Sequence, residues 1–227
     1  MIKIETILNA NLSETPYRYS LIDDVLDADD YAEFRGWSDG VLNQNPSLQR
    51  KYCDYQNTFG SFYNHDWDQV GLSTQKGNEY CQILDDHKEE ILVKYGRYRN
   101  GENLFVKSEL SFTPTGRGMV IHDENVSKIW SMVLYIYPKL SVGTVLYDHN
   151  QRYHTTVEWN PNRAIAFSCQ DNITWHSYSN MSMDVRVTLN FYIFSEDRLD
   201  DITKKAFHGA KRPVAVAKVS DQTASRG

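Results

Sequence analysis

The sequence is poor in cysteine. Only Cys53, Cys81 and Cys169 are present, and they are widely spaced and form no Cys-x-x-Cys pair. An odd number of cysteines at such spacings argues against a disulfide framework and against a zinc site built from thiolates. We therefore expect a protein of the reducing cytoplasm.

Long apolar runs and an excess of positive charge are also missing. No stretch approaches the roughly 18 apolar residues of a membrane span. The first residues, MIKIETILNANLS, lack the basic and long apolar regions of a signal peptide. The formal net charge is −6, which gives no electrostatic reason to expect nucleic-acid binding. We expect neither a membrane nor a nucleic acid as a partner.

The chain does contain enough apolar material for one substantial core. Its 227 residues are 41% hydrophobic and 13% aromatic, with 15 tyrosines, and aromatic residues favour strands. There is no internal repeat. We predict a single domain over residues 1–227, with a helical front part over about 1–100, a barrel core over about 103–197 and a C-terminal tail over about 209–227 that is loose near its end.

Local patterns predict strands and helices in the front part and strands in the core. Residues 2–8 and 17–26 read as strands, and Asp27 is expected to cap a following helix. A second helix is predicted over 73–96, capped by Ser73 and stopped by Gly96. Beyond residue 103, apolar runs are separated by four turn-like stretches, TPTGRG, KLSVGT, NPNR and SNMSM. The whole predicts a mainly β fold, an antiparallel barrel or sandwich with helices in front.

Residues 43–71, between the two predicted helices, show no clear period but are rich in aromatic side chains, namely Tyr52, Tyr55, Phe59, Phe62, Tyr63 and Trp67. Irregular segments of this length are uncommon in compact domains and are often functional. The segment either contains a short strand or two that wrap the barrel, or forms part of the substrate entrance. The second interpretation is our working hypothesis, because a reactive site needs a cover.

The stretch VIHDENVSKIW places a histidine and two acids just before an apolar strand. In an extended chain His122 and Glu124 share a face, whereas Asp123 points away. His176, in ITWHSYSN, lies 54 residues later at the end of another strand signal and offers a third ligand. Two histidines and one carboxylate on separate strands form the facial triad of non-haem Fe(II) oxygenases. A solvated strand-end histidine is the other interpretation, and Asp123 replaces Glu124 as a ligand only if the strand bulges.

The strand MDVRVTLNFYIF carries the next signal. Val185, Val187, Leu189, Phe191 and Ile193 alternate with Arg186, Thr188, Asn190 and Tyr192. A buried guanidinium needs a partner, because an unpaired buried charge is costly. A hairpin centred on Met181 would place Arg186 directly opposite His176, with Cβ atoms about 4.5–5.5 Å apart. A metal site with an arginine deeper in the same cavity suits a small dicarboxylate. Such a ligand can chelate the metal at one end and bind the guanidinium fork at the other.

With these residues in place, the sequence resembles the Fe(II)- and 2-oxoglutarate-dependent dioxygenases. The family pattern of His-x-Asp/Glu, a distal His and a later Arg-x-Ser/Thr is matched here by HDE, WH and RVT. The stretches TPYRYSLIDDVLDADDYAEF and GTVLYD are similar to the prolyl-4-hydroxylase-like branch, which has relatives in phages and marine bacteria. The likeness covers roughly residues 15–195. For a phage-encoded chain, the expected location is the host cytoplasm.

The resemblance implies a double-stranded β-helix, a jelly-roll of cupin-like type, with the N-terminal helices packed on one sheet. It implies iron held by His122, Glu124 and His176, and 2-oxoglutarate held by Arg186 with help from Thr188. The implied activity is hydroxylation of a C–H bond with O2, coupled to decarboxylation of 2-oxoglutarate to succinate. The implied substrate is a peptidyl, prolyl-like side chain, with a free amino acid or other small molecule as the alternative. Most relatives carry Asp where this chain has Glu124.

Other residues carry less weight in this interpretation. His149 and His154 are expected at the surface, and Lys128 is expected to extend to solvent. The tyrosines Tyr135, Tyr137 and Tyr192 either line the cavity or belong to the core.

Two other classes of function stay open. The first is a non-enzymatic β-sandwich that binds a ligand through its aromatics. The second is a cupin-like metalloenzyme without 2-oxoglutarate, in which Arg186 pairs with Asp184 or Glu196.

Overall fold

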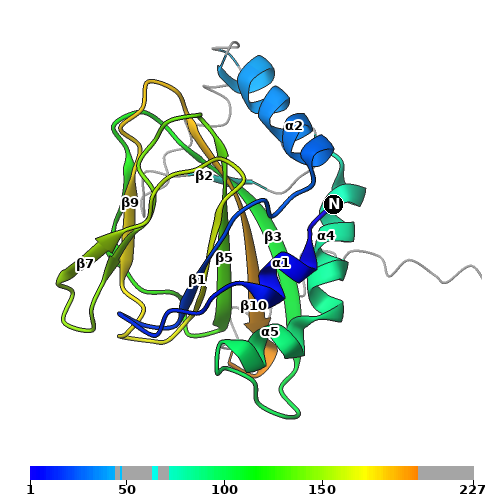
Figure 1. Ribbon diagram of the computed structural model, residues 1–227, viewed down its shortest axis with the longest axis vertical. Helices are drawn as coiled ribbons and strands as arrows, with labels where there is room; N and C mark the ends of the chain where they lie inside the picture. The colour runs from blue at the N-terminus through cyan, green and yellow to red at the C-terminus, as the bar shows by residue number, and fades with distance from the viewer. Residues whose placement is uncertain (44–46, 48–62, 66–71, 199–227) are drawn as a thin grey trace, which may run out of the picture.

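The computed structural model describes residues 1–43, 47, 63–65 and 72–198, and it contains two antiparallel sheets that face each other (Figure 1). The larger sheet has six strands in the order β1 (Tyr19–Ile22), β8 (Ala164–Ser168), β5 (Lys128–Tyr137), β10 (Arg186–Ser195), β3 (Leu104–Thr113) and β2 (Tyr63–His65). The smaller has four, in the order β4 (Gly118–His122), β9 (His176–Ser179), β6 (Val145–Tyr147) and β7 (Tyr153–Thr156). A short 3-10 turn, η3 (Glu196–Arg198), follows β10.

The helices lie on the outer face of the larger sheet, away from the smaller one (Figure 1). They are α1 (Ile4–Asn9), α2 (Ala28–Trp37), the π-helical turn η1 (Ser38–Asn43), α4 (Thr74–Asp86) and α5 (Lys88–Lys94). Asp27 caps α2 by accepting a hydrogen bond from the backbone N–H of Asp30, and Ser73 caps α4 in the same way through Lys76. Both caps confirm the sequence prediction.

Strand β10 shows how the alternating pattern divides the molecule. Its apolar members, such as Leu189 and Phe191, are buried in the core between the larger sheet and the helices, whereas Arg186 and Thr188 face the space between the sheets. All ten residues of the strand are buried. The four predicted turn stretches each separate two strands. The predicted fold class, mainly β with a jelly-roll core and helices packed on one sheet, is confirmed.

Two local predictions were wrong. Residues 2–8 do not form a strand: only Ile2 is extended, bridging to Leu26, and the chain then turns into α1. The spacing of Ile4, Ile7 and Leu8 gives the short helix an apolar side against the core. The predicted helix over 73–96 is two helices broken at His87, so that α5 packs in its own direction. Gly96 does end it, with a φ of 68°.

Two further predictions fall mostly outside the described residues. Of the 43–71 segment, β2 is described, and it pairs with β3 at the edge of the larger sheet. Its proposed role at the substrate entrance stays a prediction, as does the loose C-terminal tail. Within the described part, no helix is long and apolar enough to cross a membrane.

Candidate active site

A cavity of about 250 Å³ lies between the two sheets, and all five residues predicted for the site line it. His122 ends β4, His176 begins β9, and Arg186 and Thr188 lie on β10. Glu124 follows β4 in the loop to β5. Residues far apart in the sequence therefore converge on one cavity, as the prediction requires.

The two histidines are direct neighbours. Strand β4 pairs with β9 so that His122 lies opposite His176, and the two ring centroids are 4.3 Å apart. Each ring places Nδ1 near a backbone carbonyl, His122 at 2.8 Å from Val120 O and His176 at 2.9 Å from Thr174 O. Because a carbonyl only accepts, each Nδ1 must donate, and in the neutral imidazole Nε2 is then unprotonated. This is the tautomer that a metal-binding histidine uses.

The predicted hairpin register was wrong. His176 and Arg186 are not ladder partners, because β9 belongs to the smaller sheet and β10 to the larger, where Arg186 lies opposite Thr113. The SNMSM turn carries the chain from one sheet to the other instead of folding it back on itself. The side chain of Asn180 supports this crossing by donating to the carbonyls of Thr113 and Asp184. Both residues still line the same cavity, now from opposite sheets.

The two adjacent acids differ in their partners. Asp123 Oδ2 accepts a hydrogen bond from the backbone N–H of Asn172 at 2.7 Å. Glu124 Oε1 lies 3.8 Å from His176 Nε2 and accepts a hydrogen bond from the Ser131 hydroxyl at 3.2 Å. Strand parity does not explain this difference, since β4 ends at His122. The loop turns Glu124 toward the imidazoles and ties Asp123 to the loop before β9.

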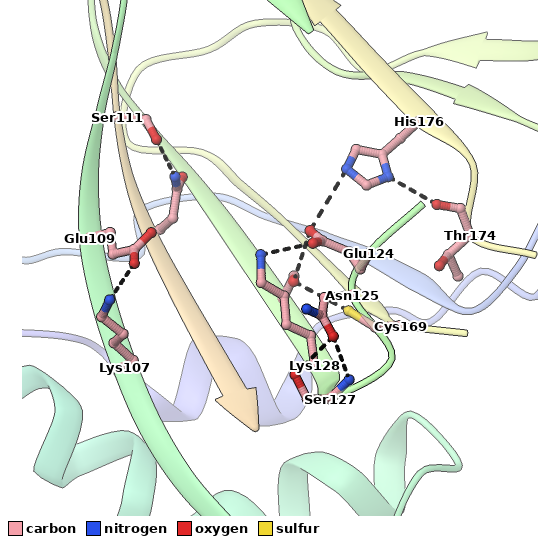
Figure 2. A network of polar contacts seen from close by, with 12 residues as sticks. Lys107, Glu109, Ser111, Glu124, Asn125, Ser127, Lys128, Cys169, Thr174 and His176 are labelled. Atoms are coloured by element: carbon pink, nitrogen blue, oxygen red, sulfur yellow. Dashed lines mark hydrogen bonds and ion pairs between the residues drawn. The ribbon is translucent and has the colours of Figure 1, made fainter. Parts of the chain in front are cut away.

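The sequence analysis predicted that Lys128 extends to solvent, and this prediction was wrong. Its Nζ lies 2.8 Å from Glu124 Oε2 (Figure 2). The same Nζ lies 3.9 Å from the centroid of the Tyr192 ring. Burial raises the pKa of Glu124, but Lys128 and the two histidines outweigh it and hold this pKa at about 2. The four-residue spacing of Glu124 and Lys128 was the available signal. It was not recognised because that spacing brings side chains together in helices, and this segment is a loop leading into a strand.

Two imidazoles and a carboxylate are donors that suit Fe(II), and the free Nε2 atoms of His122 and His176 fit that role. In the described part of the chain, however, no group of three or more His, Cys, Asp or Glu side chains is arranged as it stands to hold a metal ion. The carboxylate that would complete the set is the one held by Lys128. The three donor types therefore suit Fe(II), but in this structure the carboxylate of Glu124 is paired with Lys128.

Arg186 is buried without an acid. Arg186 is 1% exposed, and its Nε and Nη2 have no hydrogen-bond partner among the described residues. The guanidinium carbon lies 4.4 Å from the Tyr178 ring centroid and 4.9 Å from that of Trp159. Neither Asp184 nor Glu196 pairs with it within the described structure, which removes the salt bridges expected for a purely structural arginine. A buried, unpaired fork of this kind fits an anionic ligand.

The remaining candidates divide as follows. Tyr192 lines the cavity, whereas Tyr135 is buried beside it and donates from its hydroxyl to Thr144. Tyr137 donates to Asp39 instead, away from the cavity. His149 and His154 are exposed, as predicted. The sequence analysis missed Tyr178 and Trp159, because nothing in a linear pattern identifies which aromatic rings will surround Arg186.

Comparison with known proteins identifies the fold. No protein-family model matches the sequence, and no curated protein matches it. Solved structures do match. A prolyl-4-hydroxylase of Pseudomonas putida is 13% identical with a TM-score of 0.56, over 78% of this chain and 91% of that one. The chain has the fold of the prolyl hydroxylases and 2OG-Fe(II) oxygenases.

Two other structures support the same assignment of the fold. A prolyl hydroxylase of Trichoplax adhaerens, in complex with a peptide fragment of the hypoxia inducible factor oxygen degradation domain, is 15% identical with a TM-score of 0.56, over 79% of this chain and 84% of that one. The viral collagen prolyl hydroxylase of Paramecium Bursaria Chlorella virus-1 is 10% identical with a TM-score of 0.51, over 77% of this chain and 94% of that one. At such identities the similarity shows the fold.

Proposed function

We propose that this protein is an Fe(II)- and 2-oxoglutarate-dependent dioxygenase that hydroxylates a C–H bond. One observation carries the proposal: a buried guanidinium, whose Nε and Nη2 have no hydrogen-bond partner among the described residues, shares a small cavity with two imidazoles and a carboxylate. Neither half is sufficient alone. Two histidines and an acid serve many metal sites, and a buried arginine serves many anion sites. Together, in this fold, they fit a ligand that is both a metal chelator and a dicarboxylate.

His122, Glu124 and His176 are the residues that would hold Fe(II). The bound metal would supply oxygen activation, with decarboxylation of 2-oxoglutarate to succinate coupled to hydroxylation. The histidines contribute by presenting an unprotonated Nε2, since the carbonyls of Val120 and Thr174 hold the Nδ1 protons. Burial and the neighbouring His122 lower the pKa of His176 to about 4, so its ring is neutral at physiological pH. A neutral ring is the form that binds a metal.

Arg186 would bind the distal carboxylate of 2-oxoglutarate, and Thr188 would add a hydroxyl from the same face of β10. The guanidinium can offer two parallel N–H donors, which matches the two oxygens of a carboxylate. Tyr178 and Trp159 lie against the guanidinium of Arg186, a residue that is 1% exposed. A hydrogen-bonded ion pair is stronger when water is excluded. The ring contacts also fix the orientation of the fork before the ligand arrives.

The proposed substrate is a peptidyl, prolyl-like side chain. The similarity of the fold to prolyl hydroxylases, one of them in complex with a peptide, supports this choice. A free amino acid or other small molecule is the alternative substrate for the same chemistry. Succinate release measured with proline-containing peptides and with free proline separates the two, because only the true substrate stimulates turnover above the basal rate.

Anaerobic Fe(II) titration with and without 2-oxoglutarate tests the assignment directly. A metal-to-ligand charge-transfer band in the visible region is expected only when both are bound together. His122→Ala, His176→Ala and Glu124→Ala should each lose it because two remaining ligands leave a weak site. Asp123→Ala, one residue away, should keep most metal binding and is the matched control. A wild-type affinity for Fe(II) in His176→Ala, or loss of binding only in Asp123→Ala, contradicts the ligand assignment.

The same titration separates the other classes of function. A cupin-like metalloenzyme would bind Fe(II) without a response to 2-oxoglutarate, and a ligand-binding β-sandwich would not bind the metal at all. Arg186→Ala should retain Fe(II) but lose the band at 2-oxoglutarate concentrations that saturate the wild type. Arg163→Ala removes a guanidinium that pairs with Asp23 at the surface and should change neither.

A further inference from the structure

The cavity contains a second cation for which the proposed chemistry has no use. Lys128 lies at the start of β5, and its side chain is 20% exposed. Figure 2 shows its ammonium pointing at the carboxylate of Glu124. The other carboxylate oxygen, Oε1, accepts a hydrogen bond from the Ser131 hydroxyl. The aliphatic stem brings the charge over the ring of Tyr192, 3.9 Å from the centroid. Glu124 is the acid that the proposed metal site requires.

Glu124 is already paired with a positive charge inside the protein. Oε2 is 2.8 Å from Lys128 Nζ, whereas Oε1 is 3.8 Å from His176 Nε2 and does not reach hydrogen-bond distance to it. A carboxylate buried in a cavity needs a compensating charge. In the structure this charge comes from Lys128, which contacts Oε2, whereas Oε1 is the oxygen near His176.

We propose that Lys128 is the internal counter-cation of Glu124 in the metal-free protein, and that a divalent metal competes with it for this carboxylate. The inference rests on the proposed function, because it assumes that Glu124 is a metal ligand. It assigns to Lys128 a control of metal loading: the ammonium stabilises the empty site and weakens the metal-loaded one.

The direction of the effect follows from linkage. A contact that stabilises the metal-free state more than the loaded state lowers the apparent affinity for the metal. In the loaded state the metal supplies the positive charge that Glu124 needs, and the nearby ammonium is then repelled by it. If Lys128 only oriented the carboxylate, as outer hydrogen-bond partners of metal ligands do, its removal would weaken metal binding. The two roles thus predict opposite signs.

The test is the affinity of the full-length, chelator-treated protein for Mn(II) alone, measured by isothermal titration calorimetry without 2-oxoglutarate. Lys128→Met removes the charge and keeps most of the stem, and we expect Mn(II) to bind about tenfold more tightly or better. Lys128→Arg keeps the charge and should stay close to the wild type. Lys88→Met is the matched control: Lys88 is 25% exposed and also lies 2.8 Å from an acid, Asp85, on the helical side of the molecule. Its Mn(II) affinity should be unchanged.

Lys128→Gln provides a milder neutral variant in case Lys128→Met does not fold, and the same tightening is expected. An unchanged or weaker Mn(II) affinity in a folded neutral variant overturns the inference while leaving the metal site intact. Equal tightening in Lys128→Arg also overturns it, because packing and not charge would be the cause. Absence of Mn(II) binding in the wild type and in all variants instead contradicts the proposed function.

Discussion

Arg186 and Lys128 reach the same cavity from neighbouring strands, β10 and β5, but among the described residues only Lys128 faces an acid. Its ammonium lies 2.8 Å from Glu124. The guanidinium of Arg186 has aromatic rings around it and no carboxylate within the described structure. Both side chains are held by packing against tyrosine, so the surroundings differ mainly in the presence of the anion.

This difference separates a cation that is paired within the protein from one that is available to a ligand. A paired buried charge stabilises the protein relative to either partner alone. An unpaired buried charge costs free energy, and such a cost is typical of functional sites. Arg186 is therefore the residue whose partner we expect to arrive from solution.

Lys94 shows a third arrangement, in which the partners are neutral. Its Nζ donates to the carbonyls of Ile7, Leu8 and Ala10 at the end of α1, at 2.9, 3.0 and 2.5 Å. Carbonyls at a helix C-terminus carry partial negative charge and lack partners within the helix. One lysine of α5 thus fastens α1, a helix of only six residues, to the rest of the fold.

The largest expected effect is a contrast in stability between two matched substitutions. Lys128→Met should lower the free energy of unfolding of the metal-free protein by about 3 kcal/mol, because Glu124 is left buried and unpaired. Arg186→Met should leave it unchanged or raise it, because an uncompensated charge is removed. Urea unfolding followed by fluorescence measures both. A loss in Arg186→Met as large as that in Lys128→Met would mean that Arg186 has a partner inside the protein.

The next effect sharpens the role of Arg186 itself. In Mn(II)-loaded protein, Arg186→Ala should weaken 2-oxoglutarate binding by about 1.5–3 kcal/mol or more, the usual contribution of a hydrogen bond to a charged group. Arg186→Lys should recover only part of this loss, because a point charge lacks the bidentate fork. Thr188→Val should cost less, about one neutral hydrogen bond. Calorimetric titration with 2-oxoglutarate gives all three values, and equal affinity in Arg186→Ala would contradict the binding mode.

The smallest effect concerns the cation with neutral partners. Lys94→Met should lower the free energy of unfolding by about 1–2 kcal/mol, the range for a partly buried cation at a helix C-terminus. Lys88→Met, which breaks a partly exposed pair with Asp85, should cost less, about 0–1 kcal/mol. Thermal unfolding of the two variants compares them, and hydrogen exchange in α1 should rise only in Lys94→Met. Equal destabilisation without a change in α1 would show that the carbonyl contacts contribute nothing particular.

Much of the fold was predictable because its signals are local. The alternation of β10 assigned Arg186 and Thr188 to one face and Leu189 to the other, since side chains in a strand point to opposite sides. Asp27 and Ser73 marked the starts of α2 and α4, since a short polar side chain satisfies free N–H groups at a helix start. The failure at residues 2–8 has the same origin: six helical residues give too short a pattern, and packing against the core and Lys94 decides the outcome.

In the candidate site, local sequence patterns predicted the residue types but not how the strands bring those residues together. His122, Glu124, His176 and Arg186 were identified as residues of the right chemical types, and the structure brings them into one cavity. The reason given for the proximity of His176 and Arg186 was wrong, because the connection between β9 and β10 crosses between sheets. A turn of given length can close a hairpin or bridge two sheets, and the pairing partners of the flanking strands decide which.

By itself the sequence determined the period of each strand, the positions of the turns and caps, and the types of side chain available for a metal and an anion. These depend on residues close together in the chain, where backbone geometry relates spacing to direction. Only the tertiary structure decided that His122 lies opposite His176, that aromatic rings lie against Arg186, and that Lys128 turns inward to Glu124. The physical reason is that the partner of a buried charge is whichever group the packed strands bring within reach, and that choice depends on residues far apart in the chain.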